Sequence, residues 1–159
     1  MLAFLWNTFL GQIILTVGIS MVPVIELRGA IPIATGAGLN FWVALIAAII
    51  GNLIPVPFII IFIRKIFEWM RKKSHRLDNL VTKLEQRAEK KSDVVLKYAF
   101  WGLVILVAIP LPGTGAWTGA LVAAMLNMRL KKAFPAITLG VIGAAIIVSA
   151  ATLGVTWLI

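Results

Sequence analysis

Glu26 and Arg28 are two charged residues that stand alone in a long apolar part of the sequence. They are the only ionisable side chains between Met1 and Ile63. A charge at membrane depth costs about 2.5–3.5 kcal/mol on insertion scales, so a charge kept there is usually paired and functional. The planar guanidinium of Arg28 suits phosphate or carboxylate, and Glu26 suits a cation or, if it is buried, a proton. Gly29 and Pro32 follow in the same run and complete this first candidate site.

Two other interpretations of the charged pair stay open. Glu26 and Arg28 can form an internal ion pair that holds this segment to its partner, or both can lie at the interface and reach water. Residues two apart do not face one another on a helix. Direct pairing therefore needs non-helical backbone, which we expect in a polar break over 26–38.

A second break in apolar sequence carries no charge but offers several donors. A helix that begins near Gly115 would aim its amides and its positive dipole end at the turn, which favours an anion. Close packing of glycines between helices is an equal alternative. The Lys-Ser/Thr pair of a phosphate-binding P-loop is absent. The candidate residues here are Pro110, Pro112, Gly113, Thr114, Gly115, Trp117 and Thr118.

Asn52 is a third polar feature, and it precedes the run Pro55-Val56-Pro57. A helix kink is its ordinary explanation. The alternative is that Asn52 lines a polar cavity, and it is therefore kept among the candidate substrate- or ion-binding residues.

Composition excludes several functional classes. The chain has 159 residues, of which 61% are hydrophobic, with no cysteine and one histidine. No catalytic triad, HExxH motif or carboxylate pair at membrane depth is present, so we expect neither an enzyme nor a metal site nor a cofactor. Of the 15 basic residues, 11 fall between Arg64 and Lys97, beside apolar runs. That distribution is typical of positive-inside anchoring and not of nucleic-acid binding.

The lengths of the apolar stretches predict an all-α membrane protein. The stretches Phe41–Ile63 and Ala133–Ile159 have spanning length. Tyr98–Met128 has 31 residues, whereas two crossings need roughly 40 and one needs about 20. Basic residues flank both of its ends, so we expect it to enter the membrane, turn near the second break, and leave on the same side as a re-entrant hairpin.

The first two apolar stretches, Leu2–Val24 and Phe41–Ile63, together with the break between them look like a weak copy of the third and fourth stretches. Gly29-Ala30 and Gly115-Ala116 lie 86 residues apart, and Leu39-Asn40 and Leu126-Asn127 lie 87 apart. We therefore predict one domain, 1–159, of two inverted repeats, 1–63 and 98–159, joined by an amphipathic cytoplasmic linker helix over 64–97. In each repeat a re-entrant helical hairpin precedes a transmembrane helix. Because Leu2–Val24 is long enough to cross alone, a conventional bundle with an odd number of crossings is the alternative.

At the two breaks the sequence resembles the family of small multidrug export proteins. The matching residues are the runs Glu26–Pro32 and Pro110–Gly119. That family is similar in architecture to the DedA and VTT group, whose members are linked to lipid movement and to the proton gradient. The resemblance implies a lipid-phosphate or amphiphile transporter, with Glu26 as a proton or ion site and Arg28 on the anionic head group. Unlike the DedA pattern, the second break has no basic residue.

These observations together predict a small transporter in the plasma membrane. We expect a multi-pass homodimer with 64–97 and 129–132 in the cytoplasm, acting on an amphiphilic or anionic substrate among membrane lipids, with protons as a coupling partner and no nucleic acid bound. A membrane scaffold with a structural Glu-Arg pair and an exporter of cationic drugs are the alternative functions.

Overall fold

The computed structural model describes residues 7–73, 79, 82–83, 92–111 and 114–158. Every regular element in this part of the chain is an α-helix, which confirms the predicted all-α class. The helices, in order, are α2 (Phe9–Ser20), α3 (Glu26–Gly36), α4 (Phe41–Leu53), α5 (Pro55–Lys73), α7 (Ser92–Ala108), α8 (Ala116–Met125) and α9 (Leu130–Leu158).

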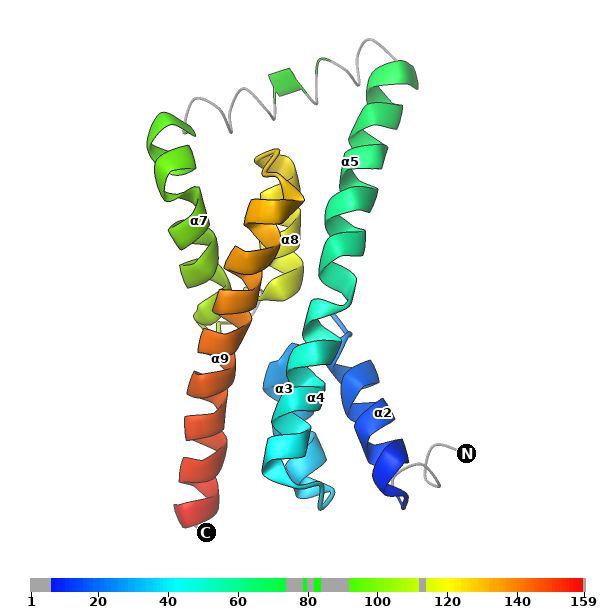
Figure 1. The fold of residues 1–159 in the computed structure, drawn as a ribbon, viewed down its shortest axis with the longest axis vertical. Coiled ribbons are helices and arrows are strands. Elements are labelled where there is room, and N and C mark those ends of the chain that lie inside the picture. Colours follow the sequence, from blue (N-terminus) through cyan, green and yellow to red (C-terminus); the bar gives the residue numbers. More distant parts are fainter. Residues whose placement is uncertain (1–6, 74–78, 80–81, 84–91, 112–113, 159) are drawn as a thin grey trace.

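Two hairpins of short helices approach each other from opposite ends of the molecule (Figure 1). Helices α2 and α3 form the first hairpin, and helices α7 and α8 form the second. Their turns lie near the middle of the long axis, where α3, α8 and the long helices converge (Figure 1). The helix pair α4–α5 and helix α9 extend along the whole assembly in opposite directions.

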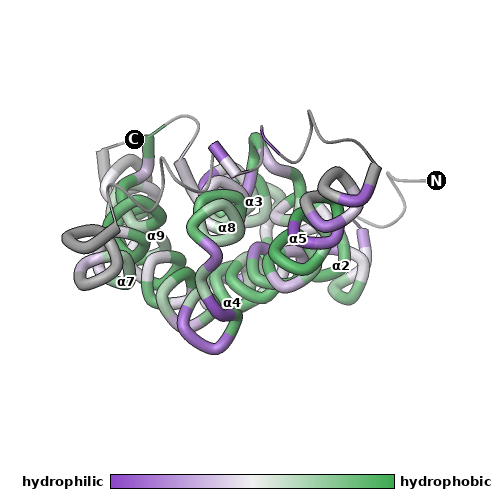
Figure 2. Tube along the Cα trace, turned by 90° about the horizontal axis from the view of Figure 1, so that it is seen from above, coloured by the Kyte–Doolittle hydropathy of each residue, from purple (hydrophilic) through white to green (hydrophobic). Residues whose placement is uncertain are grey.

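Two helices are long and apolar enough to cross a membrane, Phe41–Ile66 and Leu130–Gly154. Helix α2 has only 12 residues and at 1.5 Å per residue covers about 18 Å, less than the ~30 Å hydrocarbon core. Most residues along the helices are hydrophobic, and hydrophilic residues gather at helix ends and in connections (Figure 2). That Leu2–Val24 forms one full crossing is not supported, because the described helix in it ends at Ser20. Re-entry into the membrane stays a prediction.

The predicted polar break at 26–38 is wrong, because most of it is helix α3. The irregular backbone lies before it, at 21–25, and after it, at 37–40. Gly29 and Pro32 both have low helix propensity, but tertiary packing outweighs propensity here. The buried face of α3 packs in the main core, and Pro32 faces away from it. Its buried apolar residues are Leu27, Ala30, Ile31 and Ala34.

The boundaries of the predicted linker also differ from the structure. Helix α5 does not end at Ile63 but continues to Lys73, and α7 already begins at Ser92. The remaining part of the predicted 64–97 helix falls largely outside the described residues.

The two halves match at a constant spacing of 89 residues. Helices α3 and α8 end at Gly36 and Met125, and both are followed by a residue with positive φ, Gly38 and Asn127. Helices α4 and α9 then begin at Phe41 and Leu130. The burial pattern follows the same spacing: Ala44, Ala47 and Ala48 correspond to Ala133, Ala136 and Ile137, all of them buried.

The pairing of Leu39-Asn40 with Leu126-Asn127 inferred from the sequence is therefore out of register. The Asn40 side chain accepts a hydrogen bond from the Trp42 backbone amide and so caps the start of α4. Asn127 instead adopts φ +53 after α8. The two asparagines have different structural roles, so the fact that both positions hold asparagine is coincidental.

Gly51 and Gly140, also 89 residues apart, are the points where each long helix meets the first arm of its own hairpin. A methyl group at Gly51 would lie 2.9 Å from the Val17 Cα, and one at Gly140 would lie 2.9 Å from the Val104 carbonyl oxygen. Small residues let helices in membranes approach to this distance.

We expect Gly51→Ala and Gly140→Ala each to lower stability by about 1–3 kcal/mol, because the added methyl meets backbone that cannot rotate away. Thermal unfolding in detergent measures this. Gly18→Ala is the matched control, since nothing lies within 4 Å of its added methyl. Equal midpoints for all three variants would contradict the close approach.

Candidate functional site

Glu26 lies at the junction of the two hairpin tips. It is the first residue of α3, its side chain is 4% exposed, and it adopts φ +48, which is uncommon for a residue with a side chain. The backbone amide of Trp117 donates a hydrogen bond to the Glu26 Oε1 at 3.3 Å. The predicted anion at the start of the second helix is thus the chain's own carboxylate, at the positive dipole end of α8.

Gly115 makes this approach possible. It precedes α8 with φ +150, and a methyl group built on it would overlap the Glu26 carboxylate. Only glycine fits the position, both for its conformation and for the space.

Arg28 binds carbonyl groups at the C-terminal side of α7, whereas Glu26 binds the N-terminal end of α8. Its Nη1 donates to the Leu111 carbonyl, and its Nη2 donates to the Ile109 carbonyl at 3.2 Å and to the Thr114 Oγ1 at 3.2 Å. These carbonyls lie just after the end of α7 at Ala108, where the helix dipole favours a cation. Glu26 and Arg28 therefore do not serve mainly as an ion pair with each other. Each neutralises one end of a half-helix in the second hairpin.

The Thr114 hydroxyl organises the turn that Arg28 contacts. Its Oγ1 lies 2.7 Å from the Ile109 carbonyl and 2.8 Å from the Leu111 carbonyl, and it accepts the Leu111 amide at 3.2 Å. One small side chain thus replaces part of the hydrogen bonding that the break removes.

Trp117 makes the reciprocal contact to the first hairpin. Its indole Nε1 donates to the Met21 carbonyl at 3.0 Å, just after α2 ends. Arg28 and Trp117 are 89 residues apart and so occupy matching positions in the two halves. Each extends from the second arm of one hairpin and binds the carbonyl end of the first arm of the other hairpin. Each hairpin tip therefore contributes one side chain that holds the other tip.

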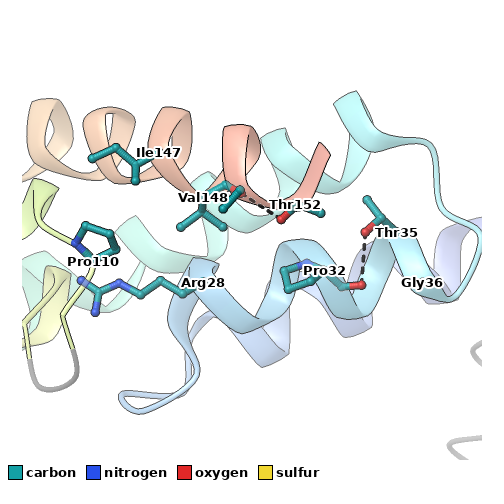
Figure 3. Close-up of a pocket in the computed structure, with 9 residues that line it drawn as sticks. Arg28, Pro32, Thr35, Gly36, Pro110, Ile147, Val148 and Thr152 are labelled. Atoms are coloured by element: carbon teal, nitrogen blue, oxygen red, sulfur yellow. Dashed lines mark hydrogen bonds between the residues drawn. The ribbon is translucent and has the colours of Figure 1, made fainter. Parts of the chain in front are cut away.

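A cavity of about 590 Å³ begins at this junction. Arg28 and Pro110 lie at one end of it, and Thr35 and Gly36 lie toward the other, with helix α9 along one side (Figure 3). Its other lining residues are Pro32, Ile147, Val148, Ala151 and Thr152. Among the described residues of this lining Arg28 is the only charged one, so the cavity has a cationic end and mostly apolar walls. The Arg28 Nε is buried and has no hydrogen-bond partner.

The predicted site residues are mostly brought together. Glu26, Arg28, Thr114, Gly115 and Trp117 meet at the tips, while Pro32 and Pro110 line the cavity. Gly29 lies inside α3 against Ile25, and Thr118 lies in the first turn of α8. Asn52 is separate: it is 1% exposed, and neither of its amide atoms has a hydrogen-bond partner among the described residues. Pro112 and Gly113 lie outside the described residues.

Sequence reasoning missed several residues of this region. Thr35 and Thr152 line the cavity, and their hydroxyls in apolar helices were the available signal. Arg64 was interpreted as a juxtamembrane charge, but its Nη2 donates to the Met128 carbonyl between α8 and α9. No group of three or more metal-ligating His, Asp or Glu side chains occurs in the part of the chain that the structure describes.

Comparison with known proteins gives one match. A family model described as "Putative small multi-drug export protein" matches residues 26–147, which include Glu26, Arg28 and the tip of the second hairpin. Searches of curated proteins and of solved structures found no match. Since the family match covers well over half of the chain and the fold contains two helices able to span a bilayer, this membrane protein belongs to the small multi-drug export protein family.

Proposed function

We propose that the protein is a membrane transporter for an anionic amphiphile, with its site where the hairpin tips meet the cavity. The observation that carries the proposal is the position of Arg28 at one end of an apolar cavity of about 590 Å³. A volume of this size accommodates a small organic ligand or part of a lipid chain. Export, as in the family name, is the activity with which this arrangement agrees.

The chemistry of the cavity favours an anionic head group over a cationic one. The apolar walls suit an acyl or prenyl chain, and the guanidinium suits phosphate or carboxylate. Arg28 uses its two terminal nitrogens on the second hairpin, and its Nε is buried, so in this proposal a head group reaches the guanidinium when the contact between the hairpins opens. Glu26, the group that would attract a cationic drug, accepts a hydrogen bond from the α8 amide instead.

Alternating exposure of the site would follow from two inverted repeats. In the proposed cycle, the contact from Arg28 and the contact from Trp117 open in turn, so that the site faces first one side of the membrane and then the other. A proton on Glu26 would weaken its hold on the α8 amide, which offers a way to couple the cycle to the proton gradient. We place this cycle in a plasma-membrane homodimer, with 64–97 and 129–132 in the cytoplasm.

A scaffold function is the second candidate, and one observation favours it. Glu26 and Arg28 both make contacts that hold the two hairpins together, which a purely structural protein also needs. A scaffold would move no substrate, and it would keep its partners without the two charges as long as the hairpins stay together.

Transport by the purified protein in liposomes decides between these functions. We expect a polyprenyl phosphate to cross faster with the protein than without it, and a cationic drug not to. Glu26→Gln should lower the transport rate by about tenfold, since a hydrogen bond to a charged group contributes about 1.5–3 kcal/mol. It should also abolish any effect of a pH gradient. Glu68→Gln, an exposed carboxylate on α5, is the matched control.

If neither substrate moves in liposomes of correctly folded protein, the transporter proposal fails and the scaffold leads. If only the cationic drug moves, the anionic head group is wrong and Arg28 does not contact the substrate.

A further inference from the structure

Asn52 is the most thoroughly buried polar side chain without a partner in the described part of the chain. It is 1% exposed, and both its Oδ1 and its Nδ2 lack a hydrogen-bond partner. An amide left unpaired in an apolar interior is costly, so such a group calls for an unseen partner.

Further oxygens lie beside Asn52 because of two prolines. Pro55 and Pro57 have no N–H, so the carbonyls of Gly51 and Leu53 lose the donor that an unbroken helix would supply. The structure has a turn at Ile54, between α4 and α5. The carbonyls at the end of α4 therefore present partial negative charge at this point.

Ser20 adds a hydroxyl to the same region. It is fully buried at the end of α2, and its Oγ donates to the Ala48 carbonyl at 2.6 Å. Ala48 lies one helical turn before Asn52, so the Ser20 hydroxyl contacts α4 within one turn of Asn52. The lone pairs of Ser20 stay available to a ligand.

The second half of the chain shows that the fold does not require these polar residues. At the spacing of 89 residues, Asn52 corresponds to Val141, which is fully buried, and Ser20 corresponds to Ile109. Pro55 and Pro57 correspond to Ala144 and Ile146. The polar side chains and the prolines occur together in the first half alone, and this points to a ligand and not to packing.

We propose that Asn52, Ser20 and the Gly51 and Leu53 carbonyls bind a small monovalent cation, with Na⁺ as the best fit. Uncharged oxygens are the ligands of hard cations. Ca²⁺ prefers several carboxylates and Mg²⁺ dehydrates reluctantly, so a neutral oxygen set in an apolar interior suits Na⁺ better. A water retained by the cation accepts the Nδ2 hydrogen bond. Unwound carbonyls at a break in a membrane helix are a known setting for such an ion.

The cation site rests on the proposed transport function and adds to it. An ion bound at the helix break would couple the Na⁺ gradient, beside the proton gradient, to the transport cycle. Its test uses binding alone, so that its failure leaves the transport proposal standing. The purified full chain is unfolded thermally in NaCl, LiCl, KCl or choline chloride at constant ionic strength, and ²²Na⁺ binding is measured at equilibrium.

We expect Na⁺ to raise the unfolding midpoint saturably over choline, as any ligand that binds only the folded state does. Asn52→Val should remove this effect and should fold, since the chain itself places valine at the matching position. Pro55→Ala restores an N–H for the Gly51 carbonyl and should weaken Na⁺ binding by about tenfold, or about 1.4 kcal/mol.

Ser149→Ala is the matched control, because the Ser149 hydroxyl is also buried without a partner but lies on α9. It should keep the full Na⁺ response. Equal midpoints of the wild type in all four salts would overturn the cation site, as would an unchanged Na⁺ response in both Asn52→Val and Pro55→Ala.

Discussion

Replacing Arg28 with alanine is expected to reduce transport of an anionic amphiphile by about 100-fold. Arg28 donates to the carbonyls of Ile109 and Leu111 at the end of α7. Each hydrogen bond from a charged group contributes about 1.5–3 kcal/mol. Losing two of them destabilises the closed junction by at least about 3 kcal/mol. Because every 1.4 kcal/mol is a factor of ten, the population of the closed junction falls by about 100-fold. The initial rate of polyprenyl phosphate movement in liposomes measures the loss.

Two further variants separate the geometry of Arg28 from its charge. Arg28→Lys keeps the charge but loses the planar guanidinium that donates to several acceptors at once. We therefore expect its transport rate to stay below a tenth of the wild-type rate. Arg129→Ala removes an exposed arginine at the loop before α9 and should transport like the wild type. A wild-type rate in Arg28→Ala, with folding retained, would show that the guanidinium is not part of the transport site.

Much of the fold could be predicted from the sequence, because it depends on length and hydrophobicity. The apolar stretches and their breaks predict short helices before long ones, and helices α4–α5 and α9 lie where spanning length places them. Glu26 and Arg28 stood out because a charge in an apolar sequence is expensive wherever it lies. These predictions needed no knowledge of the contacts.

The remaining features depend on tertiary contacts, and so the sequence alone did not reveal them. Pro32 lies within the predicted break over 26–38, yet α3 continues through it because the opposite face of the helix packs in the core. The repeat was misaligned because Asn40 and Asn127 are identical in type and different in backbone conformation. The pairing of Arg28 with α7 joins residues more than 80 positions apart, and nothing local in either motif specifies it.

Replacing Gly115, which lies against the Glu26 carboxylate, with alanine is expected to lower the stability of the protein. Alanine at φ +150 is strained, which costs about 1–3 kcal/mol, and its methyl would overlap the Glu26 carboxylate. Overpacking adds about 1–3 kcal/mol. The expected destabilisation is therefore about 2–6 kcal/mol, a large fraction of the roughly 5–15 kcal/mol by which an ordinary domain is stable. Thermal unfolding in detergent, followed by circular dichroism, measures it.

Gly102→Ala is the matched control, because that glycine lies in α7 with nothing within 4 Å of the added methyl. It should leave the midpoint unchanged or raise it slightly, since alanine is the better helix former.

A double variant separates the two causes of the Gly115→Ala loss. In Glu26→Ala the carboxylate is gone, so adding Gly115→Ala to it should cost only the backbone strain. Residues in contact show such non-additivity, typically about 0.5–3 kcal/mol. If Gly115→Ala costs the same with and without the carboxylate, the tips do not meet as the structure places them. If the cost falls, the Glu26 carboxylate and the start of α8 are in contact in the folded protein. The position then has to be glycine because a charge from the other hairpin occupies the space of a side chain.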